Sequence, residues 1–166
     1  LQTKTVSISS KPFPDAGLEP NDDAATATTV TFPYEQQGYL QSQDEDWYKL
    51  TLTSAQLVTL DLGAGTSSFY YELFAEGETH GFTYYNGLSE QGLNAGTYYL
   101  HLAAPSYSSS VAYTLKLSSK DIPDKALEPN NSFNNARAIT LPFNQDLYFT
   151  AGDEDWFKFT LSEGRL

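Results

Sequence analysis

Two short acidic segments carry the strongest signal for chemistry in this 166-residue chain. The first contains Glu19, Asn21 and Asp22, and the second contains Asp44 and Asp46. Calcium takes roughly six to eight oxygen ligands from carboxylates, carboxamides and backbone carbonyls, and these residue types supply them. The consecutive acids of the second segment also repel one another unless a cation or a basic group lies nearby. The two segments therefore predict a calcium site, provided that the fold brings them together.

A purely structural explanation of the same residues stays open. Asn21 and Asp22 precede an Ala- and Thr-rich segment at 24–29, where they could cap a single helical turn. The acids at 44–46 could equally be solvated residues of a turn between two strands.

Both acidic segments occur twice, because the chain contains an internal repeat. Residues 5–57 align without a gap on residues 114–166, a shift of 109 positions, and 23 of the 53 aligned residues are identical. The second copy of the acidic segments consists of Glu128, Asn130, Asn131, Asp153, Glu154 and Asp155. A period of this length is typical of a tandem array of whole domains rather than of a solenoid.

The repeat also predicts how the chain is divided. The expected parts are residues 1–16 as the end of a preceding unit and a linker, 17–118 as a complete domain, 119–126 as a linker, and 127–166 as the N-terminal fragment of a second copy. Residues 4–9 align with 113–118, the expected last strand of the complete domain, so we interpret the chain as a piece of a longer protein.

Composition and periodicity predict an all-β fold. Aromatic residues make up 14% of the chain, and they favour pleated, half-buried surfaces. Residues 47–52 alternate, with Tyr48, Leu50 and Leu52 on one face of a strand and Trp47 on the other. The same alternation predicts further inward-facing residues: Val58, Leu60, Leu62, Phe69, Tyr71, Leu73, Tyr98, Leu100, Leu102, Tyr113, Leu115 and Leu117. Seven or eight such strands indicate a jelly-roll-like antiparallel β-sandwich, with one complete copy and a partial second copy.

Charge and composition exclude several classes of partner. The net charge is −12 and the pI is near 4.3, which disfavours binding to nucleic acid or to an anionic membrane. No apolar run approaches the roughly 18 residues of a membrane span, so membrane insertion is not expected. The chain has no cysteine, and a bound metal ion is another way to stabilise a small exported β-domain.

Outward-facing aromatic residues are the candidates for binding a larger ligand. Strand alternation turns Trp47 and four other aromatic residues away from the core, and Trp47 recurs as Trp156, which favours a structural role for it. With the neighbouring histidine, the candidate ligand-binding residues are Tyr70, Phe74, Tyr85, Tyr99 and His101. Such a platform suits an extended peptide, although the same side chains could instead pack under loops.

Catalysis has little support in the sequence. The chain lacks both the Gly-x-Ser-x-Gly motif of serine hydrolases and the His-Glu-x-x-His motif of zinc peptidases. Its two histidines are His80 and His101, and alternation places His101 on an outer strand face as a surface histidine. A carboxylate pair of the glycosidase type stays open, but the acidic segments lie in linker and turn elements. We therefore expect no enzyme.

Four motifs in a fixed order resemble a known family. They are Glu-Pro-Asn-Asp at 19–22, Asp-x-Asp-Trp-Tyr at 44–48, Ala-Gly-Thr-Tyr-Tyr-Leu at 95–100 and Tyr-Thr-Leu at 113–115. Together they resemble the bacterial pre-peptidase C-terminal domain, a family that includes the collagen-binding domains of secreted clostridial collagenases. The resemblance covers residues 18–118 and, as an N-terminal fragment, 127–166. It implies a non-catalytic sandwich appended to exported proteins, with calcium held where the N-terminal linker meets the sandwich.

The resemblance also implies which residues bind calcium. In the first unit the implied ligands are Glu19, Asn21, Asp22, Asp44 and Asp46. In the second unit they are Glu128, Asn130, Asp153 and Asp155. Asn131 stands at the position of Asp22, so the second site has one charge less and is expected to bind calcium more weakly.

Two functions of different classes follow from these observations. The first is a calcium-stabilised, non-catalytic accessory module of a secreted bacterial protein, expected to be a peptidase, that attaches to an extracellular protein or peptide or acts as a spacer. The second is an extender or ligand-binding domain of a bacterial surface adhesin. The partial second copy is expected to be disordered, to pack on the first unit, or to be completed by strand-swapped self-association.

Overall fold

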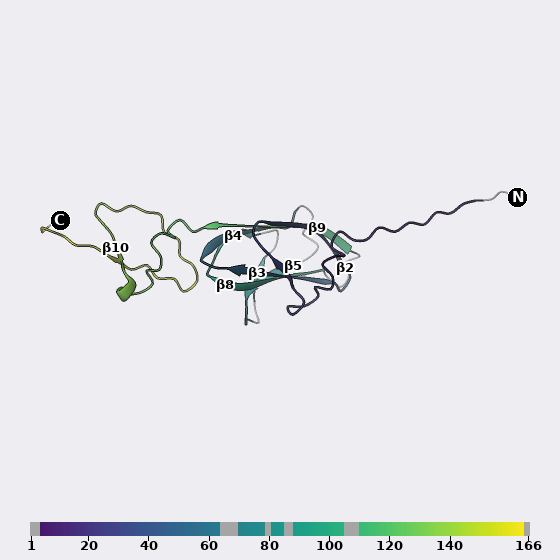
Figure 1. The fold of residues 1–166 in the computed structure, drawn as a ribbon, viewed down its shortest axis with the longest axis horizontal. Helices are drawn as coiled ribbons and strands as arrows, with labels where there is room; N and C mark the ends of the chain where they lie inside the picture. The colour runs from purple at the N-terminus through teal and green to yellow at the C-terminus, as the bar shows by residue number, and fades with distance from the viewer. Residues whose placement is uncertain (1–3, 64–69, 79–80, 85–87, 105–109, 165–166) are drawn as a thin grey trace.

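The computed structural model describes residues 4–63, 70–78, 81–84, 88–104 and 110–164, and the side chains of residues 70, 82–84, 88 and 89 are not described. A β-sandwich occupies the middle of the elongated molecule (Figure 1). The N-terminal segment leaves one end of this sandwich, and the second unit lies beyond the other end. No helix among the described residues is long and apolar enough to cross a membrane.

Nine strands form the two sheets of the sandwich. The first sheet has the order β1 (Thr28–Val30), β3 (Glu45–Leu52), β8 (Gly96–Ala103), β5 (Tyr70–Ala75) and β6 (Phe82–Tyr84). The second has the order β2 (Tyr34–Gln41), β9 (Ser110–Asp121), β4 (Gln56–Asp61) and β7 (Leu88–Leu93). All neighbouring strands are antiparallel except β1 and β3, which are parallel. The predicted all-β sandwich is confirmed.

The core contains the residues that the alternation turned inward. Tyr48, Leu50 and Leu52 on β3 are buried, as are Leu100 and Leu102 on the neighbouring strand β8. The remaining predicted core residues are buried as well, apart from Tyr98, which is partly buried, and Phe69, which lies outside the described residues. Period-2 patterning therefore placed most of the apolar side chains between the sheets.

The alternative in which Asn21 and Asp22 cap a helical turn is not what the structure shows. Residues 24–26 form a tight turn that is followed by strand β1. Asp23 stabilises this turn, because its Oδ1 accepts hydrogen bonds from the Thr26 N–H at 2.8 Å and from Thr26 Oγ1 at 2.9 Å. Asn21 and Asp22 are thus not the capping residues, and their side chains are available for another role.

The second unit forms only a few of the elements of the first. It contains a 3-10 turn, η2 (Phe133–Asn135), and two short parallel strands, β10 (Arg137–Ala138) and β11 (Phe157–Lys158). Arg137 pairs with Phe157 in this ladder, and Thr28 pairs with Tyr48 between β1 and β3. The two pairs are related by the repeat period, so β10 and β11 are the counterparts of β1 and β3. No further strand forms in the described part of this unit.

The second unit contacts the sandwich near the end of β7. Asn94, in the turn between β7 and β8, donates from Nδ2 to the Ala151 carbonyl at 3.0 Å and accepts from Thr150 Oγ1 at 2.6 Å. Large apolar side chains elsewhere in the unit, such as Phe149 and Phe159, stay exposed. The described residues of this unit form no core comparable to that of the first.

A buried row of three hydrogen-bonded side chains crosses the sandwich. The Tyr113 hydroxyl on β9 donates to Asp46 Oδ2 on β3 at 2.6 Å, and the Tyr48 and Tyr113 hydroxyls are 2.6 Å apart. The Tyr113 ring runs directly over Gly38 on β2, where a Cβ atom would lie 2.0 Å from Tyr113 Cζ. Position 38 must therefore be glycine for the hydroxyl to reach Asp46.

We predict that Gly38→Ala destabilises the first unit by roughly 2–4 kcal/mol, because the Tyr113 ring must move and its charged hydrogen bond weakens. Gly17→Ala is the matched control, since nothing lies within 4 Å of a Cβ atom there. Urea unfolding followed by tryptophan fluorescence measures both variants. Equal urea midpoints for Gly38→Ala and the wild type would contradict the close approach of the Tyr113 ring to Gly38.

Candidate functional site

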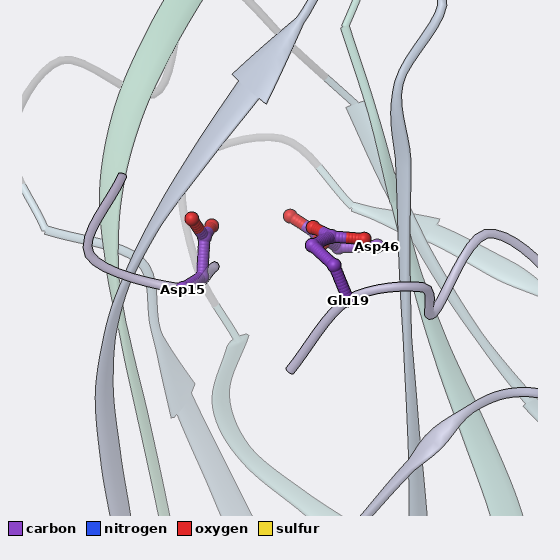
Figure 2. Close-up of side chains that lie close together, drawn as sticks. All are labelled: Asp15, Glu19 and Asp46. Atoms are coloured by element: carbon purple, nitrogen blue, oxygen red, sulfur yellow. The ribbon is translucent and has the colours of Figure 1, made fainter. Parts of the chain in front are cut away.

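The acidic residues of the first unit meet at the junction between the N-terminal linker and the sandwich. Carboxylate oxygens of Asp15, Glu19 and Asp46 all lie within 4.8 Å of one another. Figure 2 shows Asp15 and Glu19 on the linker side and Asp46 on the sandwich, with their carboxylates in one shared space. The linker thus supplies two of the three acids, and strand β3 supplies the third.

Glu19 belongs to a second acidic group beside the first. Its carboxylate lies within 4.8 Å of those of Asp22 and Asp44. A cavity of about 470 Å³ lies over this region, and Asp15, Glu19, Asp22 and Asp44 are among its lining residues. The buried group therefore continues into a solvent-accessible one, which provides a path by which an ion can enter.

Backbone hydrogen bonds hold the linker residues in place. The Trp47 N–H donates to the Asn21 carbonyl at 2.8 Å, which ties the linker end to the start of β3. The Asn21 N–H donates to Glu19 Oε2 at 3.3 Å. The Tyr39 N–H on β2 donates to Asp15 Oδ2 at 2.5 Å. These contacts fix the three linker side chains relative to both sheets.

Two oxygen atoms and one nitrogen at this junction are buried without a hydrogen-bond partner. Asn21 is completely buried and Asp46 is 1% exposed. Asn21 Oδ1 and Nδ2 and Asp46 Oδ1 have no partner within hydrogen-bonding geometry. Buried polar groups are paired in most proteins, so unpaired oxygens next to three carboxylates are best explained by a bound cation. The all-oxygen donor set fits calcium.

Burial and neighbouring carboxylates raise the pKa values of the acids at the junction. Burial raises the pKa of Asp46 from its ordinary 3.8 to about 6, although the Tyr113 hydrogen bond and the nearby Asn21 carboxamide oppose this rise. The pKa of Glu19 is also raised, first by burial and then by the charges of Asp44 and Asp22. A divalent cation would relieve both effects, because it stabilises the charged carboxylates.

The second unit has a corresponding group. Carboxylate oxygens of Asp124, Glu128 and Asp155 lie within 4.8 Å of one another, and Asn130 is completely buried beside them. Asn130 Nδ2 donates to Asp155 Oδ1 at 2.7 Å. One oxygen of each of these four side chains is buried without a partner. Three of the four predicted ligands therefore come together.

Asp153, the fourth predicted ligand of the second unit, is not part of this group but lies near it, because its charge adds to the effect of burial in raising the pKa of Glu128. Its Oδ2 accepts the Thr150 N–H at 3.3 Å, and no triple of acids among the described residues includes it. The first unit gains its second acidic group from Asp22, whose counterpart Asn131 has no carboxylate. In the first unit the hydroxyls of Tyr48 and Tyr113 lie next to Asp46. The second unit lacks the first of these hydroxyls, because Phe157 stands at the position of Tyr48.

Sequence reasoning missed Asp15 and Asp124. Both are nearly fully buried, and the Tyr148 N–H donates to Asp124 Oδ2 at 2.7 Å just as Tyr39 does to Asp15. A signal was present, because Pro-Asp recurs at the same place in both linkers. It was overlooked because a single acid in a proline-containing linker is usually solvated.

The outward aromatic residues form a contiguous group on the first sheet. The Trp47 ring stacks on His101 with centroids 4.4 Å apart and meets Phe74 edge-on at 5.4 Å. Phe74 in turn stacks on Tyr99 at 6.3 Å. Lys49 Nζ lies 5.3 Å from the centre of the Tyr99 ring. Phe74 and Tyr99 are half-buried, so parts of both rings face solvent.

The expected surface exposure of His101 is wrong. It lies on the outer face of β8 as predicted, but it is only 8% exposed because the Trp47 ring covers it. His101 Nε2 is 3.1 Å from Glu45 Oε2, and burial lowers the pKa of the imidazole. Tyr70 lies in β5 with its side chain outside the described part, and Tyr85 and His80 lie outside the described residues altogether.

Comparisons with known proteins find similar structures at low sequence identity. No family model matches the chain, and no curated protein matches it. PliG of Aeromonas hydrophila, a periplasmic lysozyme inhibitor of g-type lysozyme, is 19% identical with a TM-score of 0.49, covering 57% of this chain and 96% of PliG. The pre-peptidase C-terminal domain of collagenase from Bacillus anthracis is 19% identical with a TM-score of 0.43, covering 57% and 94%. At this identity the likenesses concern the fold alone.

We predict that Asp46 makes the metal-free protein less stable as the pH rises. Its folded-state pKa exceeds the unfolded value, so the folded form binds more protons between pH 4 and 6 and loses stability across that window. The difference between 3.8 and about 6 corresponds to roughly 3 kcal/mol. In EDTA, the unfolding free energy of the wild type minus that of Asp46→Asn should fall by most of this amount from pH 4 to 7. A pH-independent difference would contradict the raised pKa.

Proposed function

We propose that this chain is a non-catalytic, calcium-stabilised accessory module of a secreted bacterial protein, carried by a peptidase, which attaches to an extracellular protein or peptide or acts as a spacer. The observation that carries the calcium assignment is the set of unpaired, buried oxygens on Asn21 and Asp46 beside the carboxylates of Asp15 and Glu19. Export and attachment to a peptidase follow from the resemblance of the sequence motifs.

The proposed role of calcium is to join the linker to the sandwich. Asp15 and Glu19 come from the linker, whereas Asp46 belongs to β3. Without a cation the three carboxylates repel one another, which opposes the hydrogen bonds that hold the linker, such as that from the Trp47 N–H to the Asn21 carbonyl. With a cation, the same three carboxylates become shared ligands and hold the linker against the sandwich.

The proposed ligand surface is the aromatic group on the outer face of the first sheet. Half-exposed Phe74 and Tyr99 can stack on a ligand, while Trp47 and His101 support them from within the group. Lys49 beside Tyr99 forms an ion pair with Glu76, with 3.8 Å between Nζ and Oε1. The Glu76 carboxylate thus offsets the one positive charge beside the platform. The net charge of −12 favours neutral or basic peptide over anionic polysaccharide.

The alternative is an extender or ligand-binding domain of a surface adhesin. The internal repeat favours it, because extenders are built from many copies of one domain. The complete reading frame decides between the two: a peptidase domain supports the accessory module, and many further copies at the same period support the adhesin.

We predict that calcium raises the melting temperature of the first unit. At a hundredfold excess over Kd, binding to the folded state adds roughly 2.7 kcal/mol, which corresponds to at least several degrees. Differential scanning calorimetry in EDTA and in millimolar calcium measures the shift. Asp46→Asn should remove most of it, whereas Glu78→Gln, an exposed acid outside the junction, should leave it unchanged. Superimposable wild-type curves would refute the site.

We predict that Tyr99→Ala weakens retention on insoluble collagen or gelatin, because the exposed half of the platform is lost. The matched control is Phe133→Ala, which removes an exposed aromatic ring from the second unit instead. Chitin and cellulose serve as polysaccharide surfaces in the same pull-down. Equal retention of the wild type and Tyr99→Ala, or retention on polysaccharide alone, would refute peptide binding and favour the spacer role.

A further inference from the structure

Two apolar side chains are buried outside the core of the sandwich. Leu57 on β4 and Ile122, which directly follows β9, are each 4% exposed, yet neither belongs to the apolar cluster between the two sheets. Leu57 faces away from that cluster, because its neighbour Val58 points inward and successive residues of a strand alternate. A leucine on a free outer face of a sheet would be exposed to solvent, so this part of the second sheet is covered.

Tyr148 of the second unit lies on this part of the second sheet. Its ring takes the place of a side chain at Gly92 on β7, where a Cβ atom would lie 2.4 Å from Tyr148 Cε1 and 3.2 Å from Thr150 Cγ2. Gly92 is the cross-strand partner of Leu57, so the two residues share the outer face of the sheet. The absence of a side chain at Gly92 therefore makes room for the ring beside Leu57.

Asn94 adds a polar contact at the edge of the same surface. Its side-chain amide binds the Ala151 carbonyl and the Thr150 hydroxyl of the second unit. Its own backbone carbonyl accepts a hydrogen bond from the Tyr98 hydroxyl at 3.0 Å, which holds the turn against the sandwich. Three residues of the first unit thus form a docking site for the second: Leu57, Gly92 and Asn94.

The tyrosine in the docking site is also held from within the second unit. The Tyr148 N–H donates to Asp124 Oδ2 at 2.7 Å. The first unit holds the equivalent Tyr39 in the same way through Asp15, and the Tyr39 ring stacks on Phe13 of the linker with centroids 4.5 Å apart. Because the first unit has a complete sandwich, a complete unit can present this tyrosine on its surface, and the docking does not depend on strands that the second unit lacks.

We propose that the docking site holds two successive units of this fold at one fixed angle, with the tyrosine of the following unit as its occupant. Burial of Leu57 and of the tyrosine ring favours the docked arrangement over a freely moving linker. Gly92 determines the fit, because a larger residue would place its side chain where the ring lies. The following unit lies beyond one end of the sandwich (Figure 1), so docking gives an elongated, rigid pair of units.

Docking leaves the proposed ligand surface open. The docking site is on the second sheet, whereas Phe74 and Tyr99 of the aromatic group lie on strands of the first sheet. A rigid pair of units would therefore present the aromatic group in a defined direction relative to the rest of the protein. The proposal goes beyond the calcium site and the ligand surface, and its test requires neither calcium nor a ligand.

A disulfide equilibrium measures how firmly the two units are docked. The chain has no cysteine, so introduced thiols are the only ones present. Asn94→Cys with Thr150→Cys joins two side chains whose Oδ1 and Oγ1 atoms are 2.6 Å apart when docked. In a glutathione buffer, a free tether gives an effective thiol concentration in the millimolar range, and docking should raise it by roughly tenfold or more. Asn94→Cys with Ser162→Cys, whose second position is exposed in the same unit, is the control and should give the value of a free tether.

Substitutions in the first cysteine pair test which residues hold the units together. Tyr148→Ala and Gly92→Ala should each lower the effective concentration to that of the control pair. Tyr39→Ala, at the same position of the repeat but on β2, is the matched control and should leave it unchanged. All three side chains face outward, and circular dichroism melting curves check that the sandwich stays folded. An effective concentration no higher than that of the control pair, or one that Tyr148→Ala leaves unchanged, would overturn the proposal.

Discussion

The structure depends on a carboxylate that is enclosed between two sheets. Asp46 is almost fully buried, and one of its oxygens is held by Tyr113 while the other has no partner. A buried carboxylate with only one of its oxygens paired is costly. The Asp46 carboxyl must therefore either be protonated or lie next to a bound cation. Gly38 is required because the Tyr113 ring crosses it, and Asn21 is buried because it faces the same space.

This constraint explains why the linker is part of the domain. Asp15 and Glu19 lie outside the strands, yet they complete the oxygen set around Asp46. The second unit keeps the equivalent linker acids, Asp124 and Glu128, although most of its sandwich is absent from the described residues. The junction is therefore the part of the repeat that forms locally, whereas the core of the first unit also needs strands as distant as β8 and β9.

Period-2 patterning predicted the core well, because residues such as Leu50 and Leu100 must alternate to fill the space between two sheets. The site was predicted in part. Motif resemblance named Glu19 and Asp46, but the role of Asp15 depends on how the linker folds back onto β2, and no local pattern encodes that approach. The burial of His101 was missed for a similar reason, since alternation gives the face of a residue but not what covers it.

A crystal structure of the protein grown with calcium would show directly whether the junction holds an ion. We expect an ion there, coordinated at roughly 2.3–2.6 Å by Asn21 Oδ1 and Asp46 Oδ1 together with carboxylate oxygens of Asp15 and Glu19. Anomalous scattering would identify the ion as calcium. A junction without an ion at millimolar calcium, in which Asn21 Oδ1 and Asp46 Oδ1 accept hydrogen bonds from protein groups, would contradict the calcium site.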